Sequence, residues 1–497
     1  MPLIPMGDVP AWFADRLGPE RLCMAHRDER VSWADMAIRS NSRALAMKRL
    51  GVAPDDVVAL VLPNSNAVFE FAFAIWKLGA TPCVISPRLP ADELESVLDL
   101  ARPRAILAED AAIRRATGAL PTDLGLDEEL DETVPSVVGS RWKAITSGGS
   151  SGRPKVIVDL APGAVDPDEA LLGLPRGGVV LNAGPLHHNA PFRFMSGALF
   201  RGNSVVSMPR FDAEEALRLI EHHRVEWANL VPTMMSRIWG LPEEVRSRYD
   251  LSSLRAVWHT AAPMPAWLKE AWIDWIGPEK VWEIYGGTER QGNTVIGGHD
   301  WLTHRGSVGR PINCDIRILG EGGEVLPPGE VGEVHFLPHT GPGSTYRYLG
   351  AEPQRSEDGY ETIGDFGRLD EEGFLYIADR RTDLIIRGGV NIYPAEIENA
   401  LSEHPGVDDA VVIGLPDRDL GAVVHAIVTR PADGAEPVTA EALQAFLSTR
   451  LATYKLPVAY EFAEPPLRDE AGKVRRSRLR AERIAGRADA EGVPADV

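Results

Sequence analysis

Cysteine is scarce in this chain of 497 residues. The three cysteines, Cys23, Cys83 and Cys314, lie far apart in the sequence. Their separation matches neither the close pairs of a structural zinc site nor the density of a disulfide framework. We therefore expect small buried side chains at these positions, without a structural metal or disulfide.

Long apolar runs are also missing. No segment reaches the roughly 18 consecutive apolar residues of a membrane-spanning helix. The opening "MPLIPMGDVPAWFADRL" lacks the basic flank and apolar core of a secretion signal. Hydrophobic residues at 44% and charged residues at 25% are ordinary for a globular protein, and the length favours more than one domain. We expect a folded cytoplasmic protein.

An excess of basic charge is absent as well. The chain has 52 basic and 72 acidic residues, a formal charge of −20, which repels nucleic acid. The stretch "KVRRSRLR" (473–480) is locally basic and by itself would fit a surface patch or an RNA contact. The acidity of the whole chain argues against a nucleic-acid partner.

Alternating helical and apolar patterns organise the first part of the chain. A helical pattern at 31–52 is followed by an apolar run at 57–63, a second helical pattern at 67–80 and a second run at 82–86. The same alternation returns between 179 and 260, so we expect a parallel sheet covered by helices. From about 305, short runs between Gly and Pro turns predict a small antiparallel subdomain.

The sequence after "DRRTDLIIRGG" (379–389) has the pattern of a compact α+β unit that ends near residue 480. Residues 481–497 are rich in Ala, Gly and charge, so we expect a disordered tail. No repeat of solenoid period is present.

The loop "SGGSSGRPK" (147–155) is rich in backbone donors and carries one late cation, Lys155. A helix-based phosphate loop needs a helix directly after the glycines, but Pro154 and the β-branched "VIV" that follows Lys155 favour a second strand. Lys155 also stands too far from Gly152 for a Walker loop. Such a loop can still hold phosphate oxygens through its N–H groups, although alone it would read as a surface linker.

Four further stretches follow that loop in order: "EIYGGTERQG" (283–292), "YETIGDFGRLDEEGFLYIADRRTDLIIRGGVNIYPAEIE" (360–398), "HPGVDDAVVIGLPD" (404–417) and "RDEAGKVRRSRLR" (468–480). Together they resemble the acyl-adenylate-forming superfamily of acyl-CoA synthetases, peptide-synthetase adenylation domains and firefly luciferase. The resemblance spans roughly residues 10–480. "TERQG" followed by "WLTHRGSVGRP" (301–311) is most similar to CoA ligases of the bile-acid type.

The resemblance implies an α/β fold with three parts. A large N-terminal adenylation domain (1–381) would contain αβαβα layered sheets and a small β-barrel-like subdomain. A hinge would join it to a mobile α+β lid domain (382–480). The implied reaction uses ATP, Mg²⁺ and CoA: a carboxylate attacks the α-phosphate, pyrophosphate leaves, and a thiol then displaces AMP.

The resemblance also assigns the nucleotide contacts. Glu289 matches the magnesium ligand, Asp365 the carboxylate that accepts the ribose hydroxyls, and Arg380 the arginine that reaches ribose or phosphate. Tyr285 would pack on adenine beside "TAAP" (260–263). The nucleotide-binding set is Ser147, Gly149, Ser150, Ser151, Gly152, Lys155, Ala261, Ala262, Tyr285, Gly286, Gly287, Thr288, Asp365, Arg380 and Lys473. Without the family frame, Glu289 would read as a cap, Asp365 as a turn residue and Arg380 as a solvated charge.

Catalytic and acyl contacts follow from the same resemblance. The catalytic set is Lys473, Glu289, Thr288, His188 and Arg380, with Lys473 acting on the carboxylate and α-phosphate in the first half-reaction. The acyl pocket would comprise His187, His188, Gly287 and Gly292. If His187 and His188 lie in a strand, their side chains point opposite ways, which makes a shared metal improbable. "HNAPFRFM" (188–195) has no Asp to hold an α-ammonium, so we expect a hydrophobic acid, cyclic or aryl, without an α-amine.

Two positions depart from the family pattern. Gly148 stands where most members carry a hydroxyl residue in the phosphate loop. Thr382 occupies the hinge, where relatives have Asp or Lys. After rotation of the lid, Gly388 and Gly389 would line the path of the CoA arm.

Several alternatives remain open on sequence grounds. The acceptor could be a carrier-protein pantetheine or an amine instead of CoA, or the second reactant could be nitrite in nitrogen–nitrogen bond formation. A non-catalytic nucleotide-binding regulator is the rival from another class. The acid itself and the oligomeric state are not encoded in these motifs.

Overall fold

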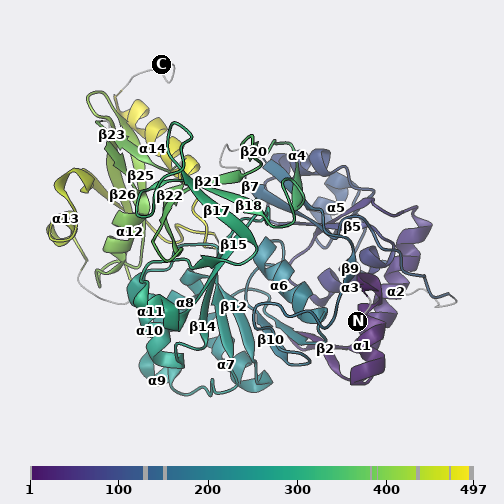
Figure 1. Ribbon diagram of the computed structural model, residues 1–497. Helices are drawn as coiled ribbons and strands as arrows, with labels where there is room; N and C mark the ends of the chain where they lie inside the picture. Colours follow the sequence, from purple (N-terminus) through teal and green to yellow (C-terminus); the bar gives the residue numbers. More distant parts are fainter. Residues whose placement is uncertain are drawn as a thin grey trace.

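The computed structural model describes residues 3–126, 132–148, 154–380, 383–388, 390–431, 437–469 and 472–491, without the side chains at 147–148, 380 and 486–491. Two large sheets with helices between and outside them form the greater part of the molecule (Figure 1). A small antiparallel sheet and a C-terminal α+β region adjoin them.

The first large sheet has six strands in the order β19-β8-β7-β5-β4-β6. Its strands are β4 (Val57–Val61), β5 (Thr81–Ile85), β6 (Ala105–Ala108), β7 (Lys143–Gly148), β8 (Pro154–Asp159) and β19 (Tyr346–Leu349). β4 pairs in parallel with β5 and β6, whereas β7 and β8 form an antiparallel hairpin. The predicted strand-to-strand setting of the glycine-rich loop is therefore confirmed.

The second large sheet has nine strands in the order β16-β15-β14-β13-β12-β10-β11-β2-β3. They are β2 (Leu22–His26), β3 (Glu29–Ser32), β10 (Val179–Asn182), β11 (Ser204–Ser207), β12 (Trp227–Leu230), β13 (Ala256–His259), β14 (Val281–Gly286), β15 (Asn293–Gly297) and β16 (Arg310–Pro311). The six neighbouring strands β14, β13, β12, β10, β11 and β2 are parallel, as the βα alternation predicts.

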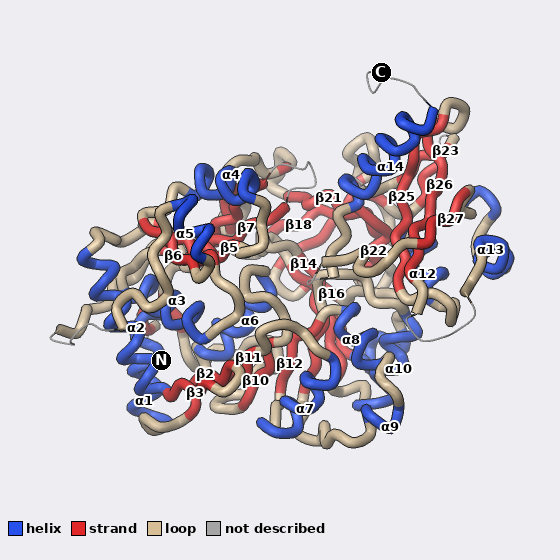
Figure 2. The backbone as a smooth tube through the Cα atoms, turned by 180° about the vertical axis from the view of Figure 1, so that it is seen from behind, coloured by secondary structure: helices blue, strands red, loops and turns tan. Residues whose placement is uncertain are grey.

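Helices cover both sheets and separate them. The central layer holds α2 (Trp33–Arg49), α3 (Asn66–Lys77) and α6 (Asn189–Leu199). The outer layers hold α4 (Ala91–Ala101) with α5 (Ala111–Thr117), and α7 (Ala213–His223), α8 (Pro232–Trp239), α9 (Glu243–Arg246) and α10 (Ala266–Ile276). This is the predicted αβαβα layering, and Figure 2 shows it from behind.

Alternation along β4 explains why its sequence is apolar throughout. Val58 and Leu60 pack against the central helices, while Ala59 and Val61 pack on the outer side with α4. Because both faces are covered, the strand is buried from Val58 to Val61. Between the sheets, the centre of the Trp76 ring lies 6.1 Å from that of Phe192 and 5.3 Å from that of Phe200. Each buried Phe side chain contributes roughly 1.5–3 kcal/mol.

Shorter elements surround these layers. They are β1 (Ile4–Pro5), the 3₁₀ helix η1 (Met6–Asp8), α1 (Val9–Leu17), β9 (Ala164–Val165) and α11 (Gly298–Thr303). Cys23, Cys83 and Cys314 are all buried, as predicted.

The predicted antiparallel subdomain is a five-stranded sheet. Its strands are β17 (Cys314–Leu319), β18 (Gly332–Pro338), β20 (Gln354–Arg355), β21 (Glu361–Leu369) and β22 (Leu375–Arg380). β21 and β22 pair so that Asp365 lies opposite the backbone of Arg380.

The C-terminal region contains β23 (Ile385–Arg387), β24 (Val390–Ile392), α12 (Pro394–Ser402), β25 (Asp409–Asp417), β26 (Gly421–Thr429), α13 (Ala440–Ser448), η2 (Thr453–Lys455), β27 (Ala459–Phe462) and α14 (Arg476–Glu491). α12 and α13 cover one face of its three-stranded sheet, and Val474 and Leu479 cover the other. The expectation of disorder from residue 481 is wrong as far as Glu491, because α14 continues through it. The predicted boundary between 381 and 382 lies outside the described residues.

Candidate active site

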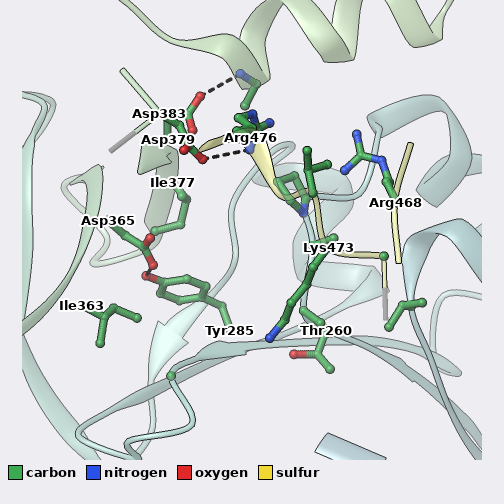
Figure 3. Close-up of a pocket in the computed structure, with 18 of the residues that line it drawn as sticks. Thr260, Tyr285, Ile363, Asp365, Ile377, Asp379, Asp383, Arg468, Lys473 and Arg476 are labelled. Carbon is green, nitrogen blue, oxygen red and sulfur yellow. Dashed lines mark hydrogen bonds and ion pairs between the residues drawn. The ribbon is translucent and has the colours of Figure 1, made fainter. Parts of the chain in front are cut away.

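A cavity of about 2450 Å³ opens between the large sheets, the antiparallel subdomain and the C-terminal region. Figure 3 shows part of its wall, with Lys473 extending toward Thr260 and the ring of Tyr285. Twelve of the residues that the motifs singled out line it: Lys155, His187, His188, Ala261, Ala262, Tyr285, Gly286, Gly287, Thr288, Glu289, Asp365 and Lys473. Segments more than 300 residues apart, such as those of Lys155 and Lys473, thus meet at one place.

Tyr285 and Asp365 form one wall of the cavity. Tyr285 is at the end of β14, and its hydroxyl donates a hydrogen bond of 2.5 Å to Oδ2 of Asp365 on β21. Asp365 is only 3% exposed. A buried carboxylate next to an aromatic ring offers acceptors for two hydroxyl groups and an apolar face, a combination that suits a ribose with its base.

Glu289 lies at a second wall and is paired with the loop cation. Oε1 of Glu289 accepts a hydrogen bond of 2.6 Å from the hydroxyl of Tyr348 and one of 3.2 Å from Nζ of Lys155. Nζ of Lys155 also lies 4.1 Å from the centre of the Tyr348 ring. Glu289, the predicted metal ligand, and Lys155, the predicted phosphate cation, are therefore in direct contact. Tyr348 is a partner of Glu289 that the motifs did not identify.

Close packing limits the space at the two glycines of "YGGTE", most strictly at Gly286, where the neighbouring atom is backbone. A Cβ on Gly287 would lie 2.7 Å from Oε2 of Glu289, and one on Gly286 would lie 2.6 Å from the backbone oxygen of Gly292. Gly292 itself does not line the cavity, contrary to the expectation for an acyl-pocket residue. A Cβ there would meet Phe336 at 2.4 Å and Cys314 at 2.5 Å, so Gly292 packs against the antiparallel subdomain.

The turn after β13 reaches the cavity through an unusual backbone conformation. Ala261 has a φ of 77°, in the left-handed region that residues with a Cβ rarely adopt. Such strain persists where the surrounding structure fixes it, commonly at a binding site. Ala261 and Ala262 both line the cavity.

His187 and His188 differ from the strand geometry expected for them. They lie in a turn before α6, and their ring centres are 4.6 Å apart. Burial, followed by the charge of Arg88, lowers the pKa of His187 to about 4; burial, followed by His187 and Lys473, lowers that of His188 to about 2. Both rings are therefore neutral at neutral pH, and His188 acts as an uncharged wall close to Lys473.

Lys473 enters from the C-terminal region on a short turn. Its backbone N–H donates to Oδ1 of Asp469 at 2.9 Å, and its carbonyl accepts from the N–H of Asp469 at 2.9 Å. Gly472 contacts the N-terminal domain, since its Cβ position lies 3.3 Å from Oγ1 of Thr233. After Lys473, the guanidinium of Arg476 pairs with Asp383 at 2.9 Å and with Glu398 at 2.6 Å.

Several predicted residues cannot be placed. Gly149, Ser150, Ser151, Gly152, Thr382 and Gly389 lie outside the described residues, as do the side chains of Ser147 and Arg380. The backbone of Ser147 pairs with Lys155 in the β7–β8 hairpin. Gly388 donates its N–H to the carbonyl of Leu420 within the C-terminal region, and its place on a CoA path stays a prediction.

A buried cationic cluster beside α6 was not identified from the sequence. Nη1 of Arg290 binds both oxygens of Asp159 at 2.8 and 2.9 Å, and Nζ of Lys143 lies 3.5 Å from Oδ2 of Asp159. Lys143 also donates to Asn189 at 2.7 Å. Arg193, one turn after Asn189 on α6, lines the cavity. The arginine stands in "HNAPFRFM", but only the fold brings Asp159 and Arg290 next to it.

Glu289 and Asp365 fit a magnesium–nucleotide complex. A hard carboxylate beside a lysine suits a divalent ion that is shared with phosphate oxygens, and such an ion keeps several waters. Across the described ranges, no group of three or more His, Cys, Asp or Glu residues could hold a metal alone. A magnesium ion that arrives with ATP needs no such cluster. No helix in the described parts of the chain is long and apolar enough to cross a membrane.

Comparison with known proteins agrees with this geometry. The family model of AMP-binding enzymes matches residues 12–349, and that of their C-terminal domain matches 396–473. A feruloyl-CoA synthase of Amycolatopsis is 33% identical, covering 94% of this chain and 96% of the relative. The fatty acid–[acyl-carrier-protein] ligase ScoC of Streptomyces coeruleorubidus is 31% identical, covering 90% and 91%. The structure of o-succinylbenzoate CoA synthetase (MenE) from Bacillus subtilis with its acyl-adenylate intermediate superposes with a TM-score of 0.82 at 26% identity, covering 96% and 98%.

Proposed function

Because the chain belongs to the family of AMP-binding enzymes, we propose that it is an ATP-dependent acid–thiol ligase that makes an acyl-CoA. In the first step a carboxylate oxygen attacks the α-phosphorus of ATP, and the bond to pyrophosphate breaks. In the second step the CoA sulfur attacks the acyl carbon, loses its proton, and AMP leaves. The observation that carries this proposal is the meeting of Tyr285–Asp365, Lys155–Glu289 and Lys473 around one cavity.

Each group has a role that follows from its position. Asp365 accepts the ribose hydroxyls while Tyr285 orients it and covers the base. Lys155 exchanges its partner Glu289 for a phosphate oxygen when the nucleotide enters, so that Glu289 becomes free to bind magnesium. Magnesium, when bound, supplies charge neutralisation on the phosphates. Lys473 stabilises the negative charge that develops between carboxylate and α-phosphate.

The acyl side of the cavity supports an acid without an α-amine. The stretch 187–195 that borders it carries no carboxylate, and neutral His187 and His188 with Ala190 line it. An ammonium group there would meet the cation Arg193 instead of a counter-ion. The substrate class is therefore a carboxylic acid with a largely apolar body, cyclic or aryl, and no charge-bearing amine.

A pyrophosphate-release screen tests this proposal. Purified protein, ATP and magnesium are offered a panel of aliphatic, aryl and cyclic acids, with and without CoA, and the products are identified by mass spectrometry. We expect acid-dependent pyrophosphate release and an acyl-CoA for at least one acid. Pyrophosphate release that never exceeds the acid-free background would contradict the proposal and favour a nucleotide-binding regulator.

The acceptor has one alternative that a specific relative favours. ScoC is a fatty acid–[acyl-carrier-protein] ligase by name, and a carrier pantetheine ends in the same thiol as CoA. Offering CoA, a pantetheine-loaded carrier protein and a simple amine in turn to the pre-formed acyl-adenylate separates these acceptors. Faster loading of the carrier than of CoA would replace CoA as the proposed acceptor.

A further inference from the structure

Three cations and one carboxylate are clustered where α6 meets the β7–β8 hairpin. Lys143 is 1% exposed and Asp159 2% exposed, and Arg193 and Arg290 are half-buried beside them. The formal charge of this group is +2 when all four side chains are ionised. An isolated positive charge in a desolvated place is costly unless an anion approaches it.

Asp159 cannot neutralise the whole group because its oxygens are already occupied. Oδ1 accepts from Arg290 at 2.8 Å and from the N–H of Ala161 at 3.0 Å. Oδ2 accepts from Arg290 at 2.9 Å and lies 3.5 Å from Nζ of Lys143. The carboxylate is therefore committed to Arg290 and Lys143.

Arg193 has no direct counter-ion among the residues that the structure describes. Within the described residues its guanidinium makes no hydrogen bond and no ion pair, although it lines the acyl side of the cavity. Desolvation, and after it the charge of Arg290, lowers the pKa of Arg193 to about 10, while Asp159 opposes this change. At neutral pH the guanidinium is still charged, and none of its five N–H donors has an acceptor within the described ranges.

We propose that Arg193, supported by Arg290, is the recognition point for a second anionic group on the acid substrate, so that the enzyme activates a diacid whose far carboxylate is bound by Arg193. A guanidinium binds a carboxylate through two parallel hydrogen bonds, and such charge-assisted pairs are strong where water is excluded. The reacting carboxylate lies at the other end, near Lys473 and His188. Ala190 on the same helix contributes an apolar wall for the body of the molecule.

This inference rests on the proposed function and adds the chemistry of the substrate's far end. It also gives Lys143 and Asp159 a positioning role: they hold Arg290 and Asn189 in place behind Arg193. Their contacts alone would fit a structural ion pair. Arg193 distinguishes the two roles, because a structural network would supply it with a partner and the described part of the chain supplies none.

Binding of matched acyl-sulfamoyl-adenosines to the full chain tests the proposal. These compounds mimic the acyl-adenylate and require no turnover, so their dissociation constants report recognition alone. Short, medium and long acyl chains are compared in pairs that differ only in a terminal carboxylate or a terminal methyl group. Arg193→Met removes the charge at similar length, Arg193→Lys restores a charge, and Arg237→Met on the exposed side of α8 is the matched control.

We expect one chain length at which the wild type and Arg237→Met bind the carboxylate-ended compound about tenfold more tightly than its methyl partner. Arg193→Met should remove this preference, and Arg193→Lys should restore part of it. If the wild type prefers the methyl-ended compound at every length, the inference is overturned but the proposed function is not. The same holds if Arg193→Met leaves a preference for the carboxylate-ended compound unchanged. Failure of all the compounds to bind the wild type contradicts both.

Discussion

The hydroxyl of Tyr285 and the carboxylate of Asp365 come from segments 80 residues apart and meet at 2.5 Å. The sequence motifs placed each of them at the nucleotide, but not in contact with each other. A carboxylate that is oriented by a hydrogen bond before the ribose arrives loses less entropy on binding. In the proposed function, the tyrosine thus positions Asp365 as well as covering the base.

Replacing Tyr285 by Phe removes only this hydroxyl. Hydrogen bonds to charged groups are worth about 1.5–3 kcal/mol, so we expect the KM for ATP to rise roughly tenfold or more while kcat changes much less. Initial rates of ATP–pyrophosphate exchange at saturating acid measure both constants. Exposed Tyr454→Phe is the control, and a loss confined to kcat would contradict a role in binding.

Because His187 and His188 are neutral in the folded protein, we expect the free energy of unfolding to fall below pH 6.5. Their folded pKa values of about 4 and about 2 lie below the ordinary value of 6.5, so the unfolded chain binds more protons as the pH falls below 6.5. Stability therefore has its full value above pH 6.5. It is lost from there down to about pH 4 through His187 and down to about pH 2 through His188, by at most about 1.4 kcal/mol per pH unit for each ring.

Urea unfolding at pH 7, 6 and 5 measures this loss. The double variant His187→Gln with His188→Gln should show a shallower decline below pH 6.5 than the wild type. The same change at exposed His299 and His339 is the control and should leave the decline unchanged. Parallel curves for wild type and the first double variant would show that neither ring is held neutral.

The position of a single residue at the cavity was predictable where that residue belongs to a local sequence motif. Glu289, Asp365 and Lys473 line the cavity as their motifs indicated. Tyr348 and Arg193 were missed because their partners are set by strand pairing and helix packing, which no local pattern encodes. The strand geometry assumed for His187 and His188 was wrong, since the turn before α6 brings the two rings together.

At the scale of elements, periodicity predicted the parallel strands and the hairpin around the phosphate loop, because buried strands and turn residues are local signals. The prediction from composition was wrong for residues 481–491, which continue α14. Charged residues at 481–485 suggested disorder, yet Arg483 binds Glu461 on β27 at 3.0 Å through its Nε and attaches α14 to the sheet. Composition alone does not reveal such a tertiary contact.

The start of α14 also fixes the turn that carries Lys473. Arg476 pairs with Asp383 and with Glu398 on α12, and its side chain is 17% exposed. Arg476→Met removes the guanidinium that both carboxylates bind, and breaking a buried pair costs about 3–5 kcal/mol, less at this exposure. We expect slower adenylation, through poorer placement of Lys473, with a smaller change in the KM for ATP.

Arg478→Met is the matched control, because Arg478 lies on the same helix, pairs with Glu482 and is 72% exposed. Thermal unfolding and the rate of acid-dependent pyrophosphate exchange are measured for both variants. Equal effects of the two substitutions would contradict an anchoring role for Arg476.

At the scale of the whole molecule, the cavity is complete only where two regions meet. The N-terminal sheets supply the walls that we propose to bind the nucleotide, and the C-terminal region supplies Lys473 through a turn that packs on Thr233. Nothing in composition or periodicity predicts this meeting, and only the order of the motifs suggested it. A lysine delivered by a separate region can act in one step of a reaction and be withdrawn for another.

Lys473→Ala tests whether Lys473 acts in the first half-reaction and not in the second. Removing the cation leaves the charge that develops between carboxylate and α-phosphate unscreened, so acid-dependent pyrophosphate exchange should fall by a hundredfold or more, to about background. Thioester formation from a supplied acyl-adenylate should persist, because AMP is then the leaving group and no phosphorus is attacked. Arg475→Ala, two residues away and weakly paired with Glu93 at 3.7 Å, controls for disturbance of the turn. If Lys473→Ala slows both half-reactions equally, Lys473 supports the fold of the cavity instead of the first chemical step.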